Sequence, residues 1–279
     1  MTATARRIDA HVHFWALARG DYDWMTPDLT TLYRDFGPQD LAPDLAAAGM
    51  GEVVLVQAAA TVAETEFLLD IAGHTDFVSG VVGWVDMESS DAGSVLARLA
   101  QNRYFKGVRP MIQDISDTGW IARDSLRPAL ELIEKQQLCF DCLVKPQHLG
   151  YLHEMLVRHP GLRAVIDHGA KPQIGAGGID GWAADMARIA AETSAYCKLS
   201  GLVTEASDHW STEMLRPYID HLLSVFGPRR LMFGSDWPVL TLAASYDEWF
   251  AAADSLLAGL SRSERDGVLG ENAARFYRL

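Results

Sequence analysis

The sequence predicts one α/β domain of the (β/α)8 TIM barrel class, spanning residues 1–279, with an extra helix at its C-terminal end. Eight short segments rich in apolar and β-branched residues recur along the chain. These segments are nearly continuous hydrophobic runs, which is typical of parallel strands that helices cover on both faces. A helix-like pattern follows each run, and eight such strand and helix pairs within about 250 residues are typical of this barrel.

Each predicted element rests on a local signal. The predicted strands cover residues 8–14, 53–57, 78–85, 105–109, 139–145, 164–168, 196–200 and 231–236. The clearest helix begins after Ser211, a residue type that caps helix N-termini, and ends at Gly227. Its apolar face comprises Leu215, Ile219, Leu222 and Phe226. Two capping boxes open the last two helices, Ser245 with Glu248 and Ser261 with Glu264.

The competing architecture is an open, doubly wound sheet that binds a dinucleotide. Its usual mark is a glycine-rich turn directly after the first strand. Here the first predicted strand continues into Phe14 and Trp15, and the glycine cluster at residues 175–178 follows the sixth strand without the full spacing of that motif. We therefore favour the closed barrel.

Composition limits the partners of the protein. The chain is 49% hydrophobic, carries a formal net charge of −13, and has three cysteines. This charge argues against nucleic acid and anionic membranes as partners. We find no signal peptide and no apolar stretch of about 18 residues, so we expect a cytoplasmic protein. Cys139 and Cys142 are three residues apart in a predicted strand, which places them on opposite faces and argues against a redox or zinc role.

Three histidines and one aspartate lie at the ends of predicted strands. His11 and His13 are two residues apart and face the same side of the first strand. His168 ends the sixth predicted strand and Asp236 the eighth. In a (β/α)8 barrel, catalytic groups come from the C-terminal ends of the strands. These four residues can bind one divalent ion, or the three imidazoles can bind a carbonyl oxygen without a metal while Asp236 acts as the base on water.

Several strings of the sequence together resemble the amidohydrolase superfamily, in its amidohydrolase-2 form. The strings are residues 8–15, 106–110, 167–172, 198–202, 234–238 and 272–277. Within the superfamily they are similar to the branch of sugar lactonases that includes L-fuconolactonases and L-rhamnonolactonases. By position, the resemblance assigns the catalytic and metal-binding roles to His11, His13, His168 and Asp236, with Asp236 activating water.

The resemblance implies a hydrolase that opens a neutral aldonolactone, such as a fucono-, rhamnono- or galactono-lactone. Many superfamily members carry a bridging lysine or glutamate and a further histidine where this chain has Arg109 and residues 141–145, so a two-metal site is not expected. The resemblance allows either one bound zinc or manganese ion or a site that works without metal. The alternatives are a metal-dependent decarboxylase of the same superfamily and a barrel that binds a sugar or lactone without turnover. The oligomeric state, with a homodimer among the options, also stays open.

Polar and aromatic residues near the predicted strand ends are candidates for binding the substrate. Arg109 and Lys145 end predicted strands, Lys171 closely follows His168, and the amide of Gln57 suits hydroxyl recognition. Flat aromatic side chains can stack on a sugar ring. The aromatic candidates are Trp15, Trp120 and Trp237.

Overall fold

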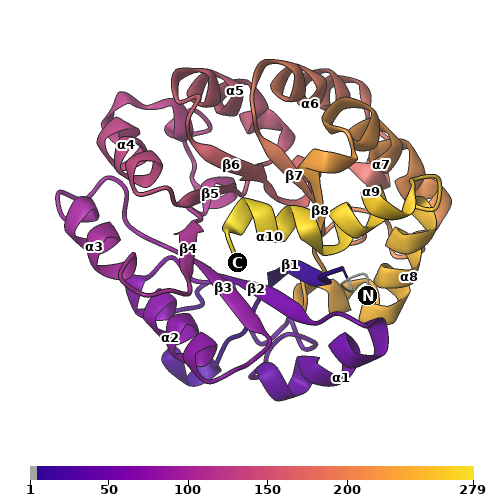
Figure 1. Cartoon of the computed structure of the whole chain (residues 1–279), viewed down its shortest axis with the longest axis horizontal. Coiled ribbons are helices and arrows are strands. Elements are labelled where there is room, and N and C mark those ends of the chain that lie inside the picture. The colour runs from indigo at the N-terminus through magenta and orange to yellow at the C-terminus, as the bar shows by residue number, and fades with distance from the viewer. Residues whose placement is uncertain (1–4) are drawn as a thin grey trace.

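A computed structural model describes residues 5–279 and confirms the predicted barrel. Eight parallel strands pair in sequence order, as Figure 1 shows. They are β1 (Ile8–Val12), β2 (Glu52–Val56), β3 (Val78–Gly83), β4 (Phe105–Val108), β5 (Cys139–Cys142), β6 (Arg163–Ile166), β7 (Tyr196–Leu199) and β8 (Leu231–Phe233). The last strand meets the first through a parallel bridge between Val12 and Trp237, which brings the two ends of the chain together around the site.

Helices surround the strands and cover their outer faces (Figure 1). They are α1 (Pro38–Ala48), α2 (Val62–Gly73), α3 (Ala92–Leu99), α4 (Arg127–Lys135), α5 (Leu149–Arg158), α6 (Asp180–Glu192), α7 (Thr212–Phe226), α8 (Tyr246–Leu256), α9 (Arg262–Asp266) and α10 (Asn272–Tyr277). The predicted caps are confirmed, because Ser211 caps α7 and the two capping boxes open α8 and α9. No helix within the described residues has the length and apolar character needed to cross a bilayer.

The extra C-terminal helix α10 lies across one end of the barrel (Figure 1). Its Phe276 and Tyr277 pack against inward-facing side chains of the strands, including Ile8 and Met232. The Asn272 side chain donates a hydrogen bond of 2.7 Å to the backbone carbonyl of Leu231 in β8. This helix therefore closes the end of the barrel opposite the strand ends that carry the histidines.

All eight strands end one to three residues earlier than the hydrophobic runs predict. β1, β6 and β8 stop before His13, His168 and Asp236, respectively. His168 and Asp236 have φ values of 55° and 64°, in the left-handed region that interrupts a strand. The predicted ranges thus extended too far at every strand. For 8–14, 164–168 and 231–236 the reason is that the site residues lie in turns that aim their side chains over the barrel. Such strained conformations cluster at functional sites.

Candidate active site

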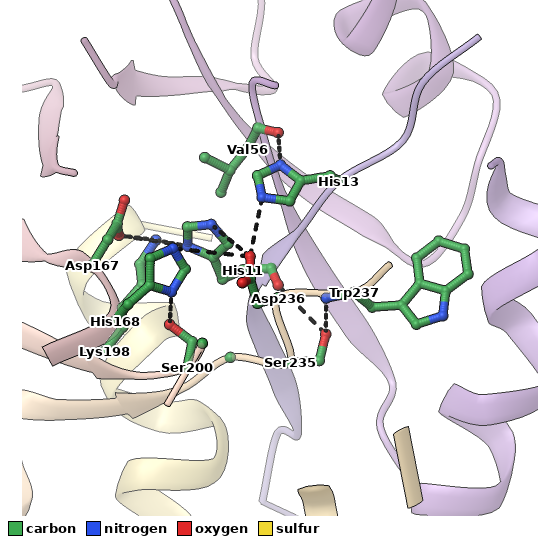
Figure 2. A network of polar contacts seen from close by, with 12 residues as sticks. His11, His13, Val56, Asp167, His168, Lys198, Ser200, Ser235, Asp236 and Trp237 are labelled. Atoms are coloured by element: carbon green, nitrogen blue, oxygen red, sulfur yellow. Dashed lines mark hydrogen bonds and ion pairs between the residues drawn. The ribbon is translucent and has the colours of Figure 1, made fainter. Parts of the chain in front are cut away.

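The four residues expected to carry chemistry meet at the C-terminal ends of β1, β6 and β8 (Figure 2). The Asp236 carboxylate stands at the centre of the group. Its Oδ1 atom lies 3.2 Å from His13 Nε2, 3.7 Å from His11 Nε2 and 3.9 Å from His168 Nε2. All four side chains are almost completely buried. The fold therefore brings three imidazoles from two distant segments to one carboxylate.

Backbone contacts across the β1 and β8 seam hold Asp236 in place. Its backbone N–H donates to the carbonyl of His11 at 2.8 Å. The buried Asp9 carboxylate accepts hydrogen bonds from the backbone N–H groups of His11 and Ser235, at 3.1 and 2.8 Å. On the other side, Gly201 leaves room for the site, since a Cβ atom there would lie 2.5 Å from His168 Nδ1. These contacts fix the backbone at Asp236, and the missing side chain at Gly201 leaves space for the His168 imidazole.

Burial controls the charge of these groups. It lowers the pKa of His13, and it lowers the pKa of His11 and His168 well below the ordinary value. Burial opposes ionisation of Asp236, but the adjacent His168 and the hydrogen bond to His13 outweigh it and lower the pKa of this carboxyl. Burial thus disfavours protonation of the imidazoles, while their proximity favours the ionised form of Asp236, and this combination suits both general-base chemistry and metal binding.

The donor set also fits one divalent metal ion. His13 Nδ1 donates to the Val56 carbonyl at 2.7 Å, so Nε2, on the side of Asp236, is the nitrogen that can bind a metal (Figure 2). A hydrogen bond of this kind orients metal-binding histidines in many proteins. Ligand atoms of His11, His13 and Asp236 all lie within 4.8 Å of one another. Two imidazoles, one carboxylate and an open position are a typical set for zinc.

A buried ionic layer lies directly beneath the imidazoles. The Lys198 ammonium, fully buried on β7, lies 2.6 Å from Asp141, 3.0 Å from Asp167 and 3.0 Å from His11 Nδ1. Tyr277 of α10 donates a hydrogen bond of 2.8 Å to the same Asp141 carboxylate. Burial lowers the pKa of Lys198, but the two carboxylates outweigh that effect and raise it. The layer connects the closed end of the barrel to His11.

A cavity of about 190 Å³ opens above this cluster. Among the predicted residues, His13, His168, Asp236, Arg109 and Lys171 line it. The other lining residues are Trp24, Ala58, Met111, Gln113, Asp114, Leu143 and Val239. A cavity of this size suits a small molecule rather than a polymer.

Arg109 lies between the cavity and the histidines. One Nη atom is 3.3 Å from His11 Nε2 and 3.6 Å from Asp167, and the other donates to the backbone carbonyl of Gln57. The guanidinium Nε has no hydrogen-bond partner within the described chain, although it is buried. Lys171 pairs with Glu205 at 3.5 Å at the edge of the site. Both cations are thus placed to contact a bound carbonyl or hydroxyl group.

The remaining substrate-contact candidates lie elsewhere. Gln57 is fully buried and donates to the Arg109 carbonyl at 2.7 Å, and Lys145 donates to the Gln113 carbonyl at 3.3 Å. Trp15, Trp120 and Trp237 are between 1% and 6% exposed and are not part of the cavity lining. Figure 2 shows the Trp237 ring pointing away from the imidazoles. The structure therefore places these tryptophans in the packing around the site.

Sequence reasoning missed several residues that the structure brings to the site. Lys198 and Asp141 each interrupt an apolar strand, which was an available signal, because charged residues are almost never fully buried without a partner. Ser200 follows β7 and lies 2.9 Å from His168 Nδ1. Trp24, in the segment between β1 and α1, carried no comparable signal.

Glu64 is a buried acid near the site that offers a stability test. Its Oε1 accepts the Ala58 backbone N–H at 2.8 Å, and burial raises its pKa from 4.5 to about 8. A folded-state pKa above the unfolded value means that the protonated acid contributes stability, which is lost as the pH rises from about 4.5 through 8. We expect Glu64→Gln to gain stability over wild type between pH 5 and pH 8.5, by at most about 1.4 kcal/mol per pH unit.

Urea unfolding at several pH values measures this effect. Glu66→Gln is the matched control, because Glu66 lies on the same helix, is half exposed and pairs with Arg98. For the control, we expect the difference in unfolding free energy from wild type to stay constant across this pH range. A constant difference between Glu64→Gln and wild type across this pH range would contradict the prediction.

The fold and the site define a class of protein, a (β/α)8 barrel with a carboxylate set among buried histidines at the C-terminal ends of its strands. The chain belongs to the amidohydrolase family, whose model matches residues 8–279. It is 45% identical over 277 residues to the L-fucono-1,5-lactonase of Burkholderia ambifaria, covering 98% of this chain and 96% of that protein. It is also 35% identical to the L-fucono-1,5-lactonase of Burkholderia multivorans, covering 99% of this chain and 97% of that protein.

A solved structure confirms the architecture and bears on the metal. A Burkholderia multivorans amidohydrolase with bound zinc superposes with a TM-score of 0.93 at 35% identity, covering 99% of this chain and all of that one. The family expected from the sequence is thus confirmed. The expectation that the site can hold one divalent ion is supported by this zinc-bound neighbour and by the donor set described above.

Proposed function

We propose that this protein hydrolyses L-fucono-1,5-lactone to the open hydroxy acid. The class, a lactone-hydrolysing amidohydrolase, rests on the family match and on lactonase relatives of 45% and 35% identity over nearly the full chain. The particular lactone is our proposal. The observation that carries the hydrolytic reaction is the Asp236 carboxylate among three imidazoles at the floor of a cavity of about 190 Å³, and the choice of lactone follows the two lactonase relatives.

In the proposed mechanism, Asp236 removes a proton from a water molecule, which then attacks the lactone carbonyl. Arg109 and the imidazoles of His13 and His168, which line the cavity, surround the carbonyl oxygen and stabilise the negative charge that develops there. Asp236 then returns its proton to the ring oxygen as the C–O bond breaks, so the products are a carboxylic acid and an alcohol. When bound by His11, His13 and Asp236, a divalent ion supplies Lewis-acid polarisation of the carbonyl.

The decarboxylase alternative receives less support, since the two named relatives above are lactonases. A protein that only binds a sugar does not need a buried carboxylate beside three imidazoles. Titratable groups with shifted pKa values of this kind are typical of reactive sites. Both alternatives predict that no acid is released from an aldonolactone.

An acid-release assay tests the proposal. We expect purified protein to hydrolyse L-fucono-1,5-lactone faster than the other aldonolactones of a panel that includes the rhamnono- and galactono-lactones, after subtraction of the uncatalysed rate. Parallel samples treated with a chelator, then resupplied with zinc or manganese, measure the dependence on metal. Absence of acid release from every lactone in metal-supplied protein would reject the proposal, and carbon dioxide release from a carboxylated substrate would establish the decarboxylase.

We further propose that the enzyme acts in the cytoplasm on a small-molecule substrate, without nucleic acid or membrane partners. The net charge of −13 supports this view. The three cysteines are free and buried, which agrees with a reducing compartment.

A further inference from the structure

Trp24 is an aromatic residue in the wall of the catalytic cavity. It lies in the segment between β1 and α1 and lines the cavity together with His13 and Asp236. Its side chain keeps 36% of its surface exposed, whereas the three tryptophans selected from the sequence are nearly fully buried. An exposed tryptophan beside reactive groups is typical of a binding surface. When a ligand covers the ring, apolar surface is removed from water, and this lowers the free energy.

The indole ring is held in one orientation before any ligand binds. Its Nε1–H donates a hydrogen bond of 2.8 Å to the Ala58 carbonyl. The Ala58 N–H in turn donates to the buried Glu64 carboxyl at 2.8 Å. On the other side, the ring meets Trp15 edge to face, with centroids 5.6 Å apart and an interplanar angle of 85°. A ligand that stacks on Trp24 therefore does not have to order it.

The rest of the cavity lining defines the chemistry of that ligand. Polar groups of Arg109, Lys171, Gln113 and Asp114 can donate to and accept from hydroxyl groups. Among residues 5–279, Trp24 is the sole tryptophan, tyrosine or phenylalanine in the lining. A saturated sugar ring has hydroxyl groups at its edge and C–H groups on its face, and so matches both kinds of surface.

We propose that Trp24 is the platform on which the ring of a neutral sugar lactone stacks, and that it thereby sets specificity for such rings. This inference rests on the proposed function, since it assumes that the cavity takes an aldonolactone. Stacking is made equally in the bound substrate and in the transition state. Loss of Trp24 should therefore raise KM and leave kcat nearly unchanged.

Two substitutions and a matched control test the inference. Trp24→Ala removes the platform and Trp24→Phe keeps a smaller one. Trp210→Phe is the control, because the Trp210 indole also donates to a backbone carbonyl, that of Ala243 at 2.9 Å, but lies outside the cavity lining. The assays are steady-state kinetics with L-fucono-1,5-lactone and calorimetric binding of the corresponding 1,5-lactam, which resists hydrolysis. Circular dichroism verifies that each variant is folded.

We expect Trp24→Ala to raise KM and weaken lactam binding by about tenfold or more, with kcat within about threefold of wild type. Trp24→Phe should recover most of the loss, and Trp210→Phe should match wild type. Unchanged KM and lactam affinity in both Trp24 variants would overturn the inference while leaving the lactonase proposal intact. If Trp24→Ala does not fold, Trp24→Leu takes its place, because leucine is apolar but has no aromatic face, and an unaltered lactam affinity in that variant overturns the inference. A wild-type enzyme inactive on every aldonolactone would instead reject the proposed function.

Discussion

Asp236→Asn should lower kcat for the lactone by about 10²- to 10⁴-fold, the usual contribution of a general acid and base. The amide cannot take a proton from water or return one to the ring oxygen. The fold should be retained, because asparagine has nearly the same shape and tolerates the left-handed backbone conformation at this position, where φ is 64°. Kinetics at saturating lactone together with thermal unfolding separate the loss of chemistry from a loss of structure.

Asp254→Asn is the matched control for this substitution. Asp254 lies on α8, pairs with Arg265 at the surface and is remote from the cavity lining. We expect it to keep wild-type turnover. If Asp236→Asn retained more than about a tenth of wild-type kcat, Asp236 would not be the base, and the assignment of the reaction to this cluster would be wrong.

Lys198→Met should cost about 3–5 kcal/mol of the free energy of unfolding, the usual effect of removing one partner of a buried ion pair. Asp141 and Asp167 are fully buried and would lose the ammonium that lies 2.6 and 3.0 Å from them. Turnover should fall as well, because Lys198 also contacts His11 Nδ1 at 3.0 Å and fixes that imidazole from below. Urea unfolding and lactone kinetics on the same preparations measure both effects.

Two further variants make this prediction specific. Lys106→Met removes a half-buried lysine from β4 that contacts the backbone of Arg278 at 3.4 Å, and we expect a small change in stability. Tyr277→Phe removes one hydrogen bond to Asp141 and should cost about 1 kcal/mol. A stability loss for Lys198→Met no larger than that of Lys106→Met would show that the buried ionic layer does not support the barrel.

Much of the site could be predicted because its residues come from strand ends. His11, His13, His168 and Asp236 each follow an apolar run, and the barrel geometry brings all such ends to one face. Local sequence was enough to predict the strands, the helix caps and the order of elements, since these depend on periodicity and on capping side chains.

Contacts between distant segments could not be predicted in this way. Trp15, Trp120 and Trp237 have the same composition signal as Trp24, but the fold buries the first three and leaves Trp24 in the cavity wall. A side chain's exposure depends on which elements pack over it, and a short stretch of sequence does not show which distant elements these are.

By itself the sequence determined the eight-stranded barrel and the four residues at its centre, because hydrophobic runs and strand-end chemistry are local properties of the chain. The family was indicated by the resemblance of several short strings to the amidohydrolase superfamily. The tertiary structure alone decided how these groups are charged and supported. Lys198 reaches His11 across 187 residues of sequence, with Asp141 and Tyr277 on further elements. Such contacts depend on barrel closure, because the pKa of a buried group is set by the charges and dipoles that the fold places around it.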